Sequence, residues 1–470
     1  MGKNIFIILI CFFLCIFSLF FSQFPLLGLV LILTVFFCIG FWVLPNIMLF
    51  LFFIFLLLQQ NLAYLTKIGI IVNLDELIII LLLLMLLLKK IILKRNFCKS
   101  KIALALFLLI IFGLVSTFMH RLVPFPIALG GLLLFLKGFI LFYIFLNSDL
   151  NQFELNKFRK MFYIVGIITL CYAVLGVIWP HFFLESIGVT YQARFGIPAL
   201  QSFLGHPGAF AALMGICFCF SFAEALIRKK SIYILMSVIF LISIIFSMRR
   251  TTLLGVLIAF FSVLLLKEVR KKIAFRIVFT HINIILVVLT LFSGIIFVSY
   301  ENLVVSYIKH ESPRLFLLKA GIKIAKDYFP LGAGFGTFSG GINQKFYSPL
   351  FYKYRLNYIS GLSESTRNFI NDTFWPHILA ETGVLGFICY VWIIVIFFLI
   401  CLKAIKYFFD QDKLIFSIAS TMILILGLVE STKATFFEIS LWAFFYFGSI
   451  AILQSWLCNN KKNNENSPDS

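Results

Sequence analysis

Charged residues are scarce in this sequence, and acidic residues are the scarcest of them. Aspartate, glutamate, lysine and arginine together make up 12% of the 470 residues, with 19 acidic against 39 basic side chains. In ordinary globular domains about a quarter of the residues are charged. Because 62% of this chain is hydrophobic and its apolar runs are long enough to cross a bilayer, the composition excludes a soluble globular protein. It predicts a polytopic α-helical membrane protein.

Three further absences narrow the class. The sequence has no series of short alternating strands, which a transmembrane barrel would need. The ten cysteines lie mostly within apolar runs and the polar stretch 300–375 has none, which argues against a disulfide framework or a thiolate metal site there. The G-x-x-x-x-G-K-[ST] pattern of a phosphate-binding loop is also missing.

The hydrophobic runs predict an all-α bundle of about 14 transmembrane helices, which form a single integral membrane domain over 1–470. Their starts lie near Asn4, Leu27, Ile47, Leu77, Ile102, Leu132, Met161, Ala209, Ile232, Thr252, Ile277, His377, Leu414 and Glu438. The third run is short before Gln59, so this helix either tilts or continues into Leu62–Val72. Two polar loops interrupt the bundle: a large one over 300–375, expected to contain amphipathic helices, and a second over 180–208.

The distribution of lysine and arginine sets the expected orientation. Basic residues gather in alternate connections, above all in 89–101 and 267–276, whereas the short connections between them hold few. By the positive-inside rule both termini are cytoplasmic, and both large loops lie on the outer side. The excess positive charge is therefore a topology signal and does not indicate nucleic-acid binding. The polar end, 459–470, is expected to be a disordered cytoplasmic tail.

Four basic residues lie on the side where this rule disfavours them. Arg249 and Arg250 fall in a tight outer turn, and Arg194 and His206 fall in the second outer loop. One such residue is often an interfacial side chain that reaches lipid headgroups. Several together favour a shared anion site.

The large loop begins with an amphipathic pattern. Ser312 and Pro313 suit the N-cap and first position of a helix that ends near Tyr328. One arc of this helix is apolar and its flank carries lysines, as in a helix that lies on a membrane surface. Arg314 is at the other edge of the apolar arc, where a guanidinium needs a specific anion.

The middle of the loop permits two interpretations. Pro330–Gly336 is rich in glycine, which suits either a turn or a close approach of backbone to a ligand or a neighbouring span. The stretch 346–358 is rich in tyrosine, phenylalanine and cations. Such aromatic side chains either stack on sugar rings or anchor the loop at the headgroup level.

The loop ends in a cluster of polar residues as the next span begins. Asp372 precedes Pro376, which suits a first helical position, and His377 and Glu381 share one helix face at i and i+4. An ionisable pair at this depth is a functional candidate, although a capping aspartate and an interfacial histidine would look alike. No third ligand has metal-binding spacing, so no metal is inferred.

Four short motifs together resemble a known family. They are Arg194-x-Gly with Gly205-His206-Pro207, then Met248-Arg249-Arg250, then Arg314 followed by Pro330–Gly336, and lastly Ala380-Glu381-Thr382-Gly383-Val384-Leu385-Gly386. In this order and on one side of the membrane, they resemble the O-antigen ligase and polymerase superfamily of bacterial envelopes. Residues before about 180 resemble it as generic spans alone.

The resemblance implies a glycosyltransferase without cofactor or metal, in the bacterial inner membrane with its active site facing the periplasm. The substrate would be an undecaprenyl-diphosphate-linked oligosaccharide in contact with membrane lipids, with a chain-length regulator and a flippase as further partners. Ligases of this family have a catalytic histidine at the position of Asp372, so the departure favours a Wzy-type polymerase of O-antigen or capsule repeat units.

The residues then take the following expected roles. Arg194, His206, Arg249, Arg250 and Arg314 would bind the diphosphate, because guanidinium groups hold phosphates bidentately. Asp372 and His377 are rival general bases, and Glu381 supports one of them. The alternatives are an O-antigen ligase, a protein O-oligosaccharyltransferase or, in another class, a flippase or exporter of the lipid-linked oligosaccharide. An exporter is disfavoured because Lys137 is the one clear mid-span cation and the sequence has no internal repeat.

Overall fold

The structure is a computed structural model that describes residues 39–465, except 68, 95, 149–151, 195–196 and 267–311. The spans predicted to begin near Asn4, Leu27 and Ile277 lie outside the described residues. The other predicted spans are all present as helices. The prediction of an all-α, polytopic membrane protein is confirmed.

Nine helices in the described ranges are long and apolar enough to cross a membrane, and two shorter ones, α10 and α11, are also apolar. The α-helices are α3 Pro45–Thr66, α4 Leu74–Ile92, α5 Ile102–His120, α6 Phe125–Asn147, α7 Gln152–Ile178, α8 Pro180–Phe183, α9 Pro207–Arg228, α10 Ser231–Phe246, α11 Arg250–Leu265, α14 Pro313–Asp327, α15 Gly340–Lys345, α16 Pro349–Lys353, α17 Trp375–Tyr407, α18 Gln411–Glu430 and α19 Ser440–Glu465.

Short elements complete the described chain. The 3-10 helices are η1 Gly69–Asn73, η2 Glu185–Ile187, η3 Leu356–Tyr358 and η4 Phe436–Glu438. Two two-residue strands in the second loop, β1 Ala193–Arg194 and β2 Ile197–Pro198, pair antiparallel with Ala193 opposite Pro198.

The structure defines the extent of the third span and of the helix that precedes the C-terminal tail. The third span is one continuous helix, α3, which runs through Gln59 to Thr66, and the Gln59 amide donates to the carbonyls of Ile71 and Val72. The tail expected to be disordered from residue 459 is helical as far as Glu465, so that expectation is corrected for this part.

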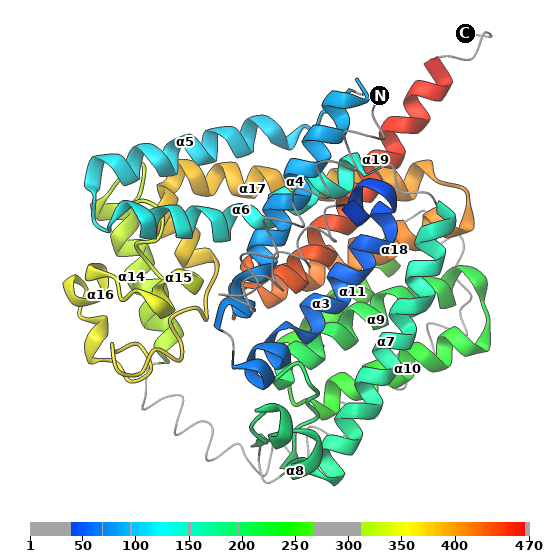
Figure 1. The fold of residues 1–470 in the computed structure, drawn as a ribbon, viewed down its shortest axis with the longest axis horizontal. Coiled ribbons are helices and arrows are strands. Elements are labelled where there is room, and N and C mark those ends of the chain that lie inside the picture. The colour runs from blue at the N-terminus through cyan, green and yellow to red at the C-terminus, as the bar shows by residue number, and fades with distance from the viewer. Residues whose placement is uncertain are drawn as a thin grey trace, which may run out of the picture.

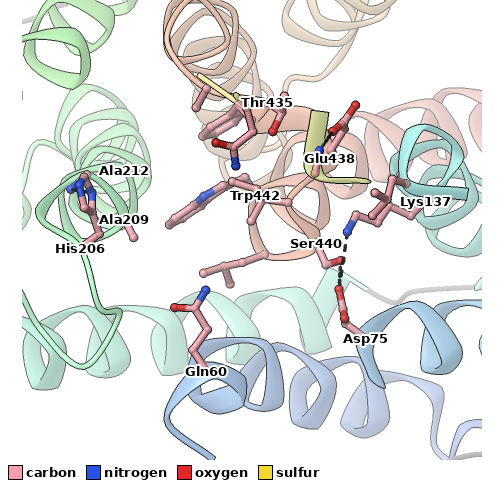
Figure 2. Close-up of a pocket in the computed structure, with 18 of the residues that line it drawn as sticks. Gln60, Asp75, Lys137, His206, Ala209, Ala212, Thr435, Glu438, Ser440 and Trp442 are labelled. Atoms are coloured by element: carbon pink, nitrogen blue, oxygen red, sulfur yellow. Dashed lines mark hydrogen bonds and ion pairs between the residues drawn. The ribbon is translucent and has the colours of Figure 1, made fainter. Parts of the chain in front are cut away.

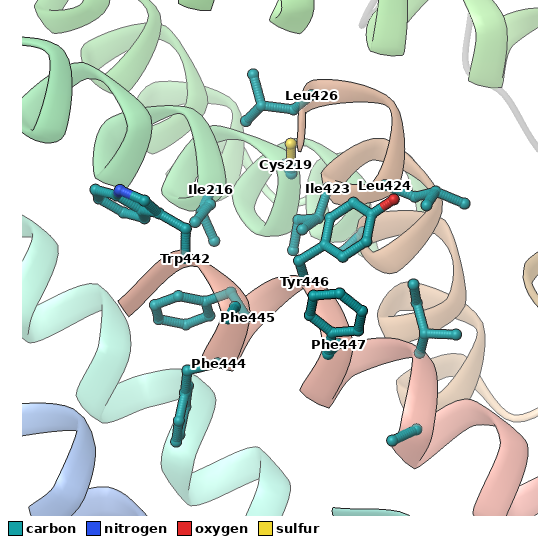
Figure 3. Close-up of a cluster of buried hydrophobic side chains, with 14 of the residues drawn as sticks. Ile216, Cys219, Ile423, Leu424, Leu426, Trp442, Phe444, Phe445, Tyr446 and Phe447 are labelled. Carbon is teal, nitrogen blue, oxygen red and sulfur yellow. The ribbon is translucent and has the colours of Figure 1, made fainter. Parts of the chain in front are cut away.

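The core is packed with phenylalanine and aliphatic side chains. Helix α9 is buried along nearly its whole length, and α7, α10, α11 and α18 surround it. Figure 3 shows where α9, α18 and α19 meet: Ile216 and Cys219 face Ile423 and Leu426, beside the aromatic run Phe444–Phe447. Side chains that bury this much apolar area fix the spans relative to one another, which sets the positions of the helix ends.

The described part of the large loop packs against one end of the helical bundle. Figure 1 shows α14, α15 and α16 gathered beside the ends of α5, α6 and α17. Helix α14 rests on α17 through Leu317, Ala320 and Ile324, and Gly321 lies close against Pro376. Leu315, Leu318 and Ile322, which belong to the apolar arc predicted from sequence, remain exposed.

The glycine-rich stretch Pro330–Gly336 fills a break in α17. Gly383 interrupts this helix with φ 66°, and the freed carbonyls of Ala380 and Glu381 accept from the amides of Ala333 and Gly334 at 2.8 and 2.9 Å. A Cβ on Gly332 would lie 2.4 Å from the Gly383 nitrogen, so neither position has room for a side chain. The glycines of both motifs therefore serve backbone-to-backbone packing between the loop and a span.

This contact predicts a large effect of Gly383→Ala. Gly383 has φ 66° and ψ −169°, a conformation that is essentially restricted to glycine and costs another residue about 1–3 kcal/mol. The new Cβ would also lie 2.2 Å from the Pro330 carbonyl oxygen. We expect the thermal unfolding midpoint of the detergent-purified protein to fall by several degrees, or the variant to fail to accumulate. Gly69→Ala, where a Cβ would meet nothing within 4 Å, is the matched control. Equal midpoints for the two variants would contradict this account of the break.

Candidate active site

A cavity of about 820 Å³ lies among the helix ends next to the large loop. Its walls come from α3, α4, α6, α9, α14 and the connection between α18 and α19, so residues far apart in sequence share it. Figure 2 shows part of its lining, with His206 on one side and Lys137 and Asp75 on the other. The ionisable residues in its wall are Asp75, Glu76, Lys137, His206, Arg249, Arg314, Lys345, Asp372, Glu430, Lys433 and Glu438.

The shortest ion pair in the cavity joins Arg314 to Asp372. Arg314 Nη2 donates to Asp372 Oδ2 at 2.6 Å, with the two side chains 37% and 20% exposed. Pro313 starts α14 one residue before Arg314, and Pro376 starts α17 shortly after Asp372. The α14–α17 packing thus brings the start of α14 close to the residues that precede α17.

Arg249 supplies a second guanidinium to the same wall. It lies in the turn between α10 and α11, where Met248 has φ 56°, and its side chain packs over Gly208 so closely that a Cβ there would lie 2.5 Å from Nη2. The neighbouring motif Gly205-His206-Pro207 starts α9: His206 caps the helix by accepting from the Gly208 amide at 3.0 Å, and Pro207 is its first residue.

Each of the two guanidinium groups has an N–H donor without an acceptor among the described residues. The Nε atoms of Arg249 and Arg314 are buried, and neither has a hydrogen-bond partner among the described residues. Burial lowers the pKa of Arg249, and the positive charge of Arg314 adds to this, while Glu430 and Asp372 oppose it. A buried donor without a partner costs free energy, so these atoms suit an anion.

Lys433 and Asp372 complete this part of the wall. Burial lowers the pKa of Lys433, and the positive charges of Arg314, Arg249 and Arg250 lower it further. Burial raises the pKa of Asp372, although Arg314 and Arg249 partly offset the increase. The region thus combines three cationic side chains with two carboxyl groups, Asp372 and Glu430, and Asp372 takes up a proton more readily than an ordinary aspartate.

His377 and Glu381 lie behind the cavity, since neither belongs to its lining. His377 Nδ1 donates to the Phe338 carbonyl at 2.5 Å, and Nε2 lies 2.7 Å from Oε1 of Glu438, which does line the cavity. Glu381 accepts from the Phe338 amide at 2.9 Å and lies 3.7 Å from His377 Nδ1. His377 and Glu381 therefore form the i, i+4 pair expected from sequence, but they contact Phe338 and Glu438 and do not line the cavity.

The remaining predicted residues have different positions. His206 lines the cavity, whereas Arg250 starts α11 with an exposed side chain and is not in the lining. Arg194 ends β1, and its side chain lies outside the described part of the structure. The structure therefore brings together His206, Arg249, Arg314 and Asp372.

One comparison with known proteins matches this region. Residues 235–391 match the family model Wzy_C, described as O-antigen ligase. This match supports the resemblance to the O-antigen ligase and polymerase superfamily for residues 235–391. The matched range of this Wzy_C domain includes Arg249, Arg250, Arg314, Asp372, His377 and Glu381. Members of the family are glycosyltransferase-like enzymes that act on lipid-linked glycans. No match was found among the curated proteins.

Several cavity residues precede or follow the Wzy_C domain and were not predicted as site residues. They are Asp75, Glu76, Lys137, Glu430, Lys433 and Glu438. Lys137 was recognisable as a mid-span cation, and Glu430 and Glu438 as carboxylates that border the last connection. Sequence position alone did not show that these separate residues share one wall. Among the described residues, no group of three histidine, cysteine or acidic side chains could hold a metal ion.

The paired guanidiniums predict anion binding that can be measured directly. Inorganic pyrophosphate should bind the purified protein in nanodiscs, and Arg249→Gln and Arg314→Gln should each weaken it about tenfold or more, as expected for a lost charge-assisted contact. Arg355→Gln, which changes an exposed loop arginine outside the cavity, is the control. Equal affinity in all three variants would show that the cavity is not the anion site.

Proposed function

We propose that this protein polymerises oligosaccharide repeat units carried on undecaprenyl diphosphate, at the periplasmic face of the bacterial inner membrane. The observation that carries the proposal is the pair Arg249 and Arg314. They come from separate segments, face one cavity and each keep a buried Nε without a partner among the described residues. The Wzy_C match supports a lipid-linked glycan as the substrate class.

The leaving group sets the main electrostatic demand of this reaction. When the anomeric carbon–oxygen bond of the donor breaks, the electron pair stays on the carrier diphosphate, which gains negative charge. Guanidinium groups remain charged at any physiological pH and bind two phosphate oxygens at once. Placed in a partly buried cavity, Arg249, Arg314 and Lys433 would stabilise that charge by several kcal/mol without a metal ion.

The acceptor hydroxyl needs a base, and the cavity favours Asp372 over His377. Asp372 lines the cavity and contacts Arg314 at 2.6 Å, which would place it beside the phosphates. Its raised pKa suits a group that receives a proton as the new glycosidic bond forms. His377 is buried behind the wall, so we assign it, with Glu381, to positioning.

The choice of polymerase over ligase rests on one position. The family resemblance puts an aspartate, Asp372, where ligases have their catalytic histidine. An O-antigen ligase and a protein O-oligosaccharyltransferase need the same diphosphate site, so they are the nearest alternatives. A flippase would also bind the diphosphate, but it would not need a base beside it.

A deletion strain separates these functions. If the protein is a polymerase, its loss should leave a single repeat unit on the surface lipopolysaccharide or capsule anchor. Loss of a ligase or flippase should leave no repeat at all, and an unchanged ladder of chain lengths would reject all three functions.

Complementation tests the diphosphate site within the same strain. Arg314→Lys keeps the charge but loses the bidentate fork and the bond to Asp372, so we expect the ladder to stay collapsed. Arg355→Lys, on the exposed loop surface, should restore the full ladder. A full ladder with Arg314→Lys would remove Arg314 from the site.

The pH dependence of polymerisation identifies the base. Asp372 must be deprotonated to accept a proton, so activity should fall as the pH drops through its pKa. Because that pKa is raised, the fall should begin at a higher pH than an ordinary aspartate gives. Asp372→Asn should lower turnover about 100-fold or more. His377→Gln should keep the acid limb in its residual activity; loss of the limb would make His377 the base.

A further inference from the structure

The cavity has a second ionisable region of opposite charge. Its arginine end holds Arg249, Arg314 and Lys433, together with the carboxyl groups of Asp372 and Glu430. Its acidic end holds Asp75, Glu76 and Glu438 around a single lysine, Lys137. In Figure 2, Asp75, Lys137 and Ser440 lie together, with Trp442 between them and His206.

The electrostatic partners of the two ends are also separate. Arg249 interacts with Glu430, Arg314 and Asp372, whereas Glu438 interacts with His377 and Lys137. The partners of Arg249 include no residue of the acidic end, and the partners of Glu438 include no residue of the arginine end. Lys345 also lines the cavity, but it is exposed and donates to Asn73 Oδ1 at 2.8 Å.

The acidic end is built from fixed groups. Gln59 donates to Asp75 Oδ1 at 2.8 Å, and Ser440 donates to Asp75 Oδ2. The His377 ring holds Glu438 from behind at 2.7 Å. Carboxylates fixed in this way can receive a ligand without first being ordered, which reduces the entropic cost of binding.

Lys137 leaves room for a hydrogen-bonding ligand. Its Nζ lies 3.7 Å from Asp75 Oδ2 and 3.6 Å from Glu76 Oε1, distances that suit an ion pair but exceed a direct hydrogen bond. The Glu76 side chain is 33% exposed, so its carboxylate can be reached from the cavity. A hydroxyl group can donate to this carboxylate and accept from the ammonium at the same time.

We propose that the acidic end is a sugar-binding subsite, in which Glu76 and Lys137 hold ring hydroxyls of the glycan. This inference rests on the proposed function and adds where the glycan lies. Three carboxylates repel phosphate, so the carrier diphosphate goes to the arginine end. Sugar hydroxyls, which both donate and accept, satisfy carboxylate and ammonium groups together.

The assignment also sets the orientation of the substrate in the cavity. A substrate with phosphates at the arginine end and sugar rings at the acidic end would have its anomeric bond between them. Because a site built to bind hydroxyl groups rejects analogues that lack them, Glu76 and Lys137 would determine which repeat unit is accepted.

Two soluble probes separate the two ends. The first is the repeat-unit oligosaccharide released by mild acid from the host strain's own lipid-linked pool, with a fluorescent label for anisotropy measurements. The second is inorganic pyrophosphate. We expect Glu76→Gln, at a partly exposed position, to weaken oligosaccharide binding about tenfold and to leave pyrophosphate affinity within about twofold.

A double variant and a matched control complete the test. Asp75→Asn combined with Lys137→Met removes opposite charges together and should also weaken oligosaccharide binding alone. If this double variant does not fold, the oligosaccharide affinity of Glu76→Gln still tests the subsite. Glu185→Gln changes an exposed carboxylate outside the cavity and should bind both probes as the wild type does.

The outcomes distinguish this inference from the proposed function. Oligosaccharide binding that is unchanged in Glu76→Gln overturns the subsite, and so does wild-type protein that binds pyrophosphate but not the oligosaccharide. Wild-type protein that binds the oligosaccharide but not pyrophosphate supports the subsite and contradicts the diphosphate site. Wild-type protein that binds neither probe overturns both.

Discussion

The arrangement of this protein depends on keeping two guanidinium groups at a partly buried cavity in a largely apolar chain. Such charges are tolerated where fixed partners offset the loss of water. Arg314 has Asp372 at 2.6 Å, and Arg249 has Glu430 and Asp372 as its opposing charges. These partners come from separate segments of the chain, so the charges can be accommodated when the surrounding helices are packed. The buried Nε atoms have no hydrogen-bond partner among the described residues, so they are the donors that an anion would use.

Part of the packing that brings these charges together is backbone against backbone. Gly332 and Gly383 approach too closely for side chains, and the amides of Ala333 and Gly334 satisfy the carbonyls that the break in α17 leaves free. This contact fixes the loop against α17 and, through it, α14 with Arg314. Buried backbone groups at membrane depth must find partners within the protein. The glycine motifs thus act on the cavity from a distance, and they do not line it.

The last connection, between α18 and α19, contributes more to the cavity than its length suggests. Glu430, Lys433 and Glu438 all lie in its wall, and Trp442 follows at the start of α19. His377, from the Wzy_C domain, holds Glu438 in place at 2.7 Å. The domain therefore acts on groups outside its own matched range. In our proposal, this contact fixes one carboxylate at the sugar-binding end of the cavity.

The sequence alone determined the class of the protein and most of its spans, because hydrocarbon thickness makes a long apolar run a span whatever surrounds it. It also identified Arg249, Arg314 and Asp372, since polar residues stand out in an apolar chain. It could not decide whether His377 or Asp372 faces the cavity, nor that Pro330–Gly336 packs against a break in α17. Asp75 and Lys137 likewise gave no sign that they share a wall with Glu438. Those facts follow from how helices distant in sequence pack, and local patterns do not contain that information.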